Sequence, residues 1–151
     1  MGLLDLASGA SAWRGYEYYK NGSVLLKKKI TDHEYSGTLR GSENKHYDVF
    51  IDIEHPRKSH CNCPHANGKR IICKHQVALY FSVFPEEAAQ YYKEVIEYEE
   101  EEERRQEELD KKVVAYINSL SKEELRQTLY EVLYDGADWV FERFVREHID
   151  Y

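Results

Sequence analysis

The sequence predicts an α+β protein, in which a short antiparallel β-sheet is followed by a helical C-terminal region. Tyr47, Val49, Ile51 and Ile53 alternate with polar neighbours, which is typical of a half-buried strand. Pro85 marks a boundary, after which the chain is acidic and reads as helix. The length of 151 residues suits one domain, or a small domain with an appendage.

The first predicted domain covers residues 1–85 and begins with a helix over 9–21. A serine can cap this helix upstream, and Asn21-Gly22 provides a stop signal. Clusters of Asp, Gly, Ser and Asn then separate three predicted antiparallel strands. These strands span 23–31, 34–41 and 46–54, and a helix over 74–84 follows the cysteine-rich segment 61–75.

The second predicted domain, residues 86–151, is an acidic helical region. It is read as a long helix over 86–112, followed by helical segments over 113–134 and 137–149. The stretch 85–120 can also be read as one long helix or as two helices joined end to end. The charged run 97–112 has almost no apolar face, so we expect it to be solvated or disordered. Ser121 and Glu124 have the spacing of a capping box and predict a helix start.

The charge of the chain is unevenly distributed. Residues 13–80 hold 12 Lys and Arg against 7 Asp and Glu, a balance of +5, whereas residues 81–151 hold 9 against 20, a balance of −11. The N-terminus has no signal-peptide pattern, and no apolar run approaches the roughly 18 residues of a membrane span. Three cysteines are an odd number and cannot all pair as disulfides. We therefore expect a cytoplasmic protein with reduced thiols and no membrane partner.

All three cysteines lie close together and predict a metal site. Cys61 and Cys63 are followed, after nine residues, by Cys73 and His75. Thiolate and imidazole suit zinc, and four of them fill a tetrahedral shell. Residues two apart cannot converge from a regular strand or helix, so both pairs must lie where the chain bends. The prediction is one structural zinc ion, with no open position for catalysis; two flanking residues, His60 and His65, are alternative ligands.

Other interpretations of the cluster fit the sequence less well. A redox dithiol usually has the spacing Cys-x-x-Cys, which does not occur here. A Cys/His nucleophile would need an orienting group that nothing in the sequence nominates. Three unrelated buried cysteines would not be expected to fall within thirteen residues beside a histidine.

The pattern Cys-x-Cys, a variable gap and Cys-x-His resembles the SWIM zinc finger. Cys-x-Cys-Pro before a short loop, and Cys-Lys-His at the start of an apolar helix, are similar to the family's form. Residues 13–84 resemble bacterial members well, and residues 119–134 resemble them loosely. The resemblance implies a zinc-clamped hairpin-plus-helix finger on a short sheet. It also implies zinc ligation by Cys61, Cys63, Cys73 and His75, and association with DNA or with proteins such as helicase-like ATPases.

Two functions stay open from the sequence. The first is a non-catalytic accessory protein that binds DNA or RNA, with phosphate contacts from basic side chains and no small-molecule substrate. The candidate contacts are Lys27, Lys28, Arg40, Arg57, Lys58, Lys69, Arg70 and Lys74. The second is a protein–protein interaction adaptor whose acidic tail meets a basic partner. An acidic helix that covers the basic face in an autoinhibited state is an intermediate hypothesis.

Overall fold

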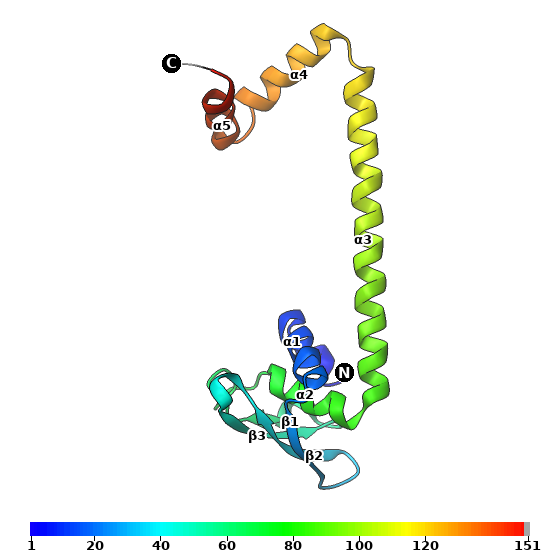
Figure 1. Cartoon of the computed structure of the whole chain (residues 1–151), viewed down its shortest axis with the longest axis vertical. Helices are drawn as coiled ribbons and strands as arrows, with labels where there is room; N and C mark the ends of the chain where they lie inside the picture. Colours follow the sequence, from blue (N-terminus) through cyan, green and yellow to red (C-terminus); the bar gives the residue numbers. More distant parts are fainter. Residues whose placement is uncertain (150–151) are drawn as a thin grey trace. The chain divides into compact units, whose positions relative to one another are not determined.

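The computed structural model describes residues 1–149, and its internal contacts divide the chain into two units, Met1–Glu97 and a unit that begins at Tyr98 (Figure 1). The first unit holds the sheet and the cysteine cluster, and the second is helical, so the predicted α+β class is confirmed. The helices are α1 (Gly9–Lys20), α2 (Lys74–Val83), α3 (Pro85–Ser119), α4 (Lys122–Tyr134) and α5 (Asp138–His148). The strands are β1 (Val24–Lys29), β2 (Glu34–Arg40), β3 (His46–Asp52) and β4 (His60–Cys61).

The sheet is antiparallel throughout, in the order β1-β2-β3-β4. Three strands match the predicted ones closely, but the prediction of three strands was incomplete. The fourth strand, β4, has only two residues, and a strand this short carries no periodicity that a sequence pattern could reveal. Its pairing places Cys61 opposite Val49 on β3, so the first cysteine is fixed against the sheet.

Helix α2 forms the centre of the first unit. It contacts β1, β2 and β3 on one side and α1 on the other, so its apolar residues are buried all round. Val77, Leu79 and Phe81 of α2 pack with Leu39 and Ile51 of the sheet, and all five are fully buried. A helix that is apolar on every face is stable only in such an enclosed position.

Helix α1 lies unusually close to α2 because Gly15 faces the contact. A Cβ placed on Gly15 would lie 2.5 Å from the Val77 Cβ and 2.9 Å from the Lys74 carbonyl oxygen. The helix begins as predicted, with the Ser8 hydroxyl accepting a hydrogen bond from the Ser11 amide at 3.1 Å. The close approach therefore sets the position of the α2 N-terminus, where the last two predicted ligands lie.

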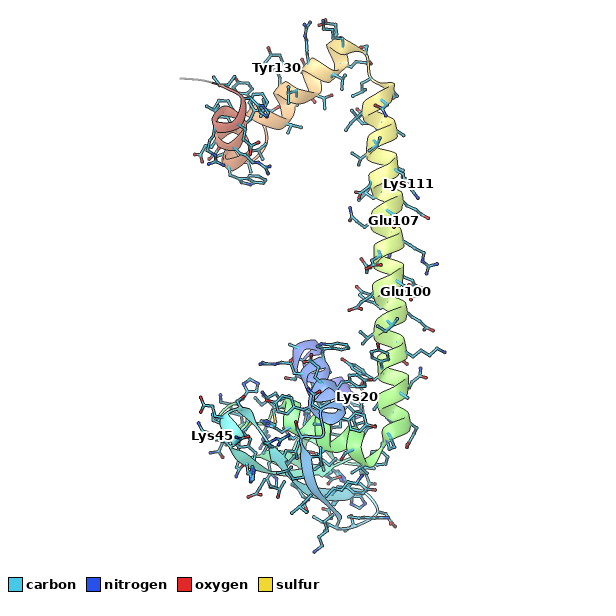
Figure 2. The ribbon with its side chains drawn as sticks, in the orientation of Figure 1. Lys20, Lys45, Glu100, Glu107, Lys111 and Tyr130 are labelled. Atoms are coloured by element: carbon cyan, nitrogen blue, oxygen red, sulfur yellow. The ribbon has the colours of Figure 1, made fainter. Side chains whose placement is uncertain are left out.

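Helix α3 corrects the predicted end at residue 112 and agrees with the alternative of one long helix over 85–120. It is continuous from Pro85 to Ser119, and the next helix, α4, begins at Lys122. The first turns of α3 pack in the first unit, where Ala88 is buried and the Tyr92 ring stacks on Tyr16 with centroids 5.2 Å apart. Glutamates and lysines keep the helix regular where it lacks an apolar face, and several of them are labelled in Figure 2.

The second unit buries little of its own surface. Leu133 is the one buried residue among residues 98–149. The predicted capping box is present, since the Glu124 amide donates to the Ser121 hydroxyl at 3.2 Å and the Ser121 amide donates to the Glu124 carboxylate at 2.7 Å. Within residues 1–149, no helix is both long enough and apolar enough to cross a membrane.

Candidate metal centre

The four predicted zinc ligands come together in the first unit. Cys61 ends β4, Cys63 begins the following loop, Cys73 is the N-cap residue of α2 and His75 lies in its first turn. One potential ligand atom from each lies within 4.8 Å of the others, and each residue is at most 3% exposed. Both pairs lie at a bend in the chain, as the two-residue spacing requires.

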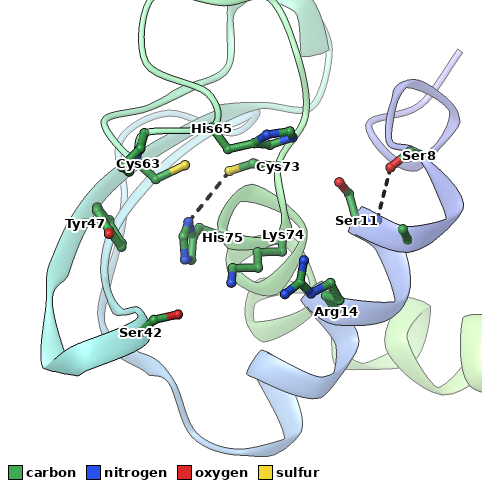
Figure 3. Close-up of a pocket in the computed structure, with 12 residues that line it drawn as sticks. Ser8, Ser11, Arg14, Ser42, Tyr47, Cys63, His65, Cys73, Lys74 and His75 are labelled. Atoms are coloured by element: carbon green, nitrogen blue, oxygen red, sulfur yellow. Dashed lines mark hydrogen bonds between the residues drawn. The ribbon is translucent and has the colours of Figure 1, made fainter.

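The separations fit a zinc ion. The His75 Nδ1 atom lies 3.8 Å from the Cys61 Sγ atom. It lies 3.9 Å from the Cys73 Sγ atom, as the dashed line in Figure 3 marks. Tetrahedral zinc bonds to sulfur at about 2.3 Å and to nitrogen at 2.0–2.1 Å, which puts two such ligand atoms roughly 3.6 Å apart. The three cysteines are free, so their sulfurs can serve as ligands. The buried Cys3His cluster therefore fits one structural zinc ion, for which four protein ligands complete the shell.

The position of Cys73 at a helix N-terminus favours its thiolate. A hydrogen bond from Cys61 lowers the pKa of Cys73 to about 4, against the opposing effect of burial, and His75 and the amides of the first turn of α2 contribute further. The same hydrogen bond and burial raise the pKa of Cys61 well above its usual value. These contacts therefore favour the thiolate form of Cys73, which is the form that binds a metal ion.

Aromatic rings hold the His75 side chain in place. The Tyr47 and Tyr18 rings lie 4.8 and 5.4 Å from the imidazole, centroid to centroid. The second ring nitrogen, Nε2, is buried and has no hydrogen-bond partner among the residues of the described chain. The side chain therefore points Nδ1 at the thiols through packing and not through a hydrogen bond on the far side of the ring.

Gln76 supports the cluster, and the sequence analysis missed it. Its Oε1 atom accepts a hydrogen bond from the Cys73 amide at 2.8 Å, and the residue is fully buried. Cys73 and Gln76 form a capping box in which a thiol takes the place of the usual hydroxyl. The spacing Cys-x-x-Gln at a predicted helix start was the signal that could have identified Gln76.

A cavity of about 400 Å³ lies beside the cluster, between it and the N-terminal half of α1. Arg14 and Lys74 contribute to its wall, together with Ser11 and Ser42, and Figure 3 labels these four residues. The Lys74 ammonium donates to the Tyr18 hydroxyl at 2.8 Å and lies 4.4 Å from the centre of its ring. Although burial raises the pKa of Tyr18, this hydrogen bond contributes to a net lowering. The Lys74 ammonium group is thus held against Tyr18 of α1.

The predicted nucleic-acid contacts separate into groups. Arg57, Lys58, Lys69 and Arg70 line one shallow depression of about 260 Å³, which has no acidic residue in its wall. We call these four residues the basic loop cluster. The others lie elsewhere.

Lys27 and Lys28 lie on β1, where the Lys27 ammonium donates to the Ser82 carbonyl. Arg40 is exposed at the end of β2, opposite His46 on β3. Neither these residues nor Lys74 line the depression of the basic loop cluster.

The two alternative zinc ligands have other environments. His60 is exposed and stacks on Phe50, with ring centroids 4.9 Å apart. His65 lines the cavity beside the cluster. Neither belongs to the group of four ligand atoms found among the described residues.

A comparison with protein families gives a match to the SWIM zinc finger over residues 47–84. That segment contains the four ligands and helix α2. Residues 47–84 are a SWIM zinc finger. Searches among curated proteins and among solved structures found no match to the chain. The likeness that the sequence suggested for residues 13–46 and 119–134 lies outside the matched segment of the SWIM finger and stays a prediction.

Proposed function

We propose that the chain is a nucleic-acid-binding accessory protein without catalytic activity of its own, and that the basic loop cluster contacts phosphates. The supporting observation is that Arg57, Lys58, Lys69 and Arg70 converge on one depression without an acidic neighbour in its wall. Arg and Lys side chains supply most phosphate contacts in protein–nucleic acid complexes.

The SWIM finger gives the loop 64–72 a fixed shape. Cys63 and Cys73 fasten its two ends, so zinc orders the segment between them. The Asn67 amide donates to the Cys63 carbonyl at 2.8 Å, and the Lys69 amide donates to the Ala66 carbonyl at 2.9 Å. Gly68 has a φ of +71°, which glycine adopts without strain. A loop that is already ordered loses less entropy when it binds.

The metal centre supports a structural and not a catalytic role. Four protein ligands leave zinc no position for a water molecule or a substrate. Three thiolates and one zinc ion together carry a charge of −1, so the positive potential of the surface comes from the basic side chains.

The second candidate is a protein-interaction adaptor, and the acidic C-terminal half of the chain favours it. Residues 81–151 carry a balance of −11, which repels nucleic acid and suits a basic partner. Leu109, Val113, Tyr116 and Ile117 of α3 are also about half exposed. Exposed apolar side chains grouped on one helix are a common feature of protein-binding surfaces.

A charge-reversal experiment separates the two functions. Fluorescence anisotropy with a labelled duplex and a labelled single strand would compare the zinc-loaded full-length protein with a Lys69→Glu/Arg70→Glu variant. A Lys111→Glu/Lys112→Glu variant has the same net charge but changes exposed residues of α3, and it serves as the matched control.

We expect the loop variant to lose about tenfold or more in affinity at low salt, and the control to lose much less. Absence of wild-type binding at low salt, or equal losses in the two variants, would contradict the proposal. The first of these results would favour the adaptor.

A further inference from the structure

A second group of metal-ligating side chains lies where β2 begins and β3 ends. His33, Glu34 and Asp52 each offer one ligand atom within 4.8 Å of the others, and none of them belongs to the SWIM finger's ligand set. His33 and Glu34 precede and begin β2, and Asp52 is the last residue of β3. We call these three residues the sheet-end cluster.

The register of the sheet opposes two carboxylates in this cluster. Glu34 and Asp52 are direct cross-strand partners, so their side chains lie on the same face of the sheet. Like charges in this position repel each other. Within residues 1–149 no Lys or Arg forms an ion pair with either residue. A cation between the two carboxylates would remove the repulsion.

Asp52 is held in place before any ligand arrives. It is 1% exposed, its Oδ1 atom accepts hydrogen bonds from the Glu54 and His55 amides at 3.0 and 2.8 Å, and its own amide donates to the Ser59 hydroxyl at 3.0 Å. Burial raises the pKa of Asp52, but the two amide donors outweigh it, so the net shift is downward. A buried, ionised and fixed carboxylate is an effective metal ligand.

Two further groups lie next to the cluster. The His55 Nδ1 atom is 3.5 Å from the Asp52 Oδ2 atom, and the His33 Nδ1 atom is 3.5 Å from the Glu54 Oε2 atom. The His33 and His55 rings have centroids 6.5 Å apart. His55 is thus a neighbour of Asp52, and Glu54 a neighbour of His33, whereas His33, Glu34 and Asp52 alone converge on one position.

We propose that the sheet-end cluster binds a second divalent transition-metal ion, with His33, Glu34 and Asp52 as ligands and with His55 next to Asp52. Mixed imidazole and carboxylate ligands suit zinc, cobalt or manganese, whereas calcium and magnesium prefer oxygen alone. The ion would fasten the start of β2 to the turn at 52–55. That turn leads directly into the 3-10 helix Pro56–Lys58, which carries two residues of the basic loop cluster.

The metal content of the full-length protein tests this site independently of nucleic-acid binding. Native mass spectrometry at increasing Zn²⁺ should show two ions per wild-type chain and one per chain of a His33→Ala/His55→Ala variant. His46→Ala is the matched control, because His46 is an exposed histidine on β3 outside the cluster, and it should keep two ions. One ion per wild-type chain, or two in the double variant, would overturn the proposal.

Cobalt substitution shows whether the finger stays intact in these variants. Only the SWIM finger offers thiolates, so its cobalt complex has a sulfur-to-cobalt charge-transfer band that the sheet-end cluster cannot produce. We expect this band to be the same in the wild type and the double variant. If the double variant loses the band, the experiment is repeated with Glu34→Gln, a variant that keeps the shape of the side chain. That variant should retain the band and bind the second ion at least tenfold more weakly, and unchanged binding would contradict the site.

Discussion

The contact between α1 and α2 predicts that Gly15→Ala destabilises the SWIM finger. The new methyl group would lie 2.5 Å from both the Cβ and a Cγ atom of Val77, and 2.9 Å from the Lys74 carbonyl oxygen. The Val77 Cβ atom and the Lys74 carbonyl oxygen cannot move aside unless α2 itself moves. The two helices must therefore separate, and the helix that moves carries Cys73 and His75 at its N-terminal end.

The size of the effect follows from two opposing contributions. Overpacking of a closed core costs about 1–3 kcal/mol, and contacts this short with Cβ and backbone atoms put Gly15→Ala near the upper end. Replacing glycine by alanine inside a helix returns roughly 1 kcal/mol. We therefore expect the free energy of unfolding to fall by about 2 kcal/mol.

Urea denaturation of the cobalt-loaded protein measures this change. The thiolate-to-cobalt absorbance disappears when the finger unfolds, so it reports the first unit alone. Gly9→Ala is the control, because it lies in the same helix and a Cβ there meets no atom within 4 Å. Its stability should be unchanged or slightly higher. If Gly15→Ala is as stable as Gly9→Ala, the account of the α1–α2 contact is wrong.

Three further predictions concern other parts of the molecule. Gln76→Ala leaves the buried Cys73 amide without its acceptor, so the finger should lose about 1–3 kcal/mol of stability and release zinc faster to a chelator, whereas the exposed Gln127→Ala should not. Hydrogen bonds from the Ser121 amide and hydroxyl lower the pKa of Glu124. The cap therefore stabilises α4 fully above the ordinary carboxyl pKa, and this stabilisation is lost as the pH falls through the lowered pKa. Circular dichroism should show a loss of helix at low pH that is smaller in Glu124→Gln, and equal losses would contradict the cap. Duplex affinity should fall with salt with a log–log slope of about −3.6 if all four residues of the basic loop cluster contact phosphates, and a slope near zero would exclude those contacts.

Much of the first unit could be predicted from the sequence. The alternation through Tyr47, Val49 and Ile51 specified a strand, and the cysteine spacing specified ligands placed at bends. These features depend on residues that are close together in the sequence, so a local sequence pattern is enough to predict them. In the second unit, the capping box at Ser121 was predicted for the same reason.

The features that sequence analysis missed depend on long-range packing. β4 is a strand only through its pairing with β3, in which Cys61 lies opposite Val49. The sheet-end cluster forms because the register of β2 and β3 pairs Glu34 with Asp52. The basic residues formed one series in the sequence, but folding placed only four of them around one depression. The sequence did not decide between one long helix over 85–120 and two joined helices, because the charged run of α3 offers no apolar periodicity from which to judge its end.

The most direct test of the account is the coordination shell of the zinc ion in the SWIM finger. X-ray absorption at the zinc edge, on the His33→Ala/His55→Ala variant loaded with one equivalent of zinc, avoids a contribution from the sheet-end cluster. Cys61, Cys63, Cys73 and His75 predict three sulfur neighbours at about 2.3 Å and one nitrogen at about 2.0–2.1 Å. A shell with fewer than three sulfurs, or with an oxygen in the fourth position, would contradict a closed structural site.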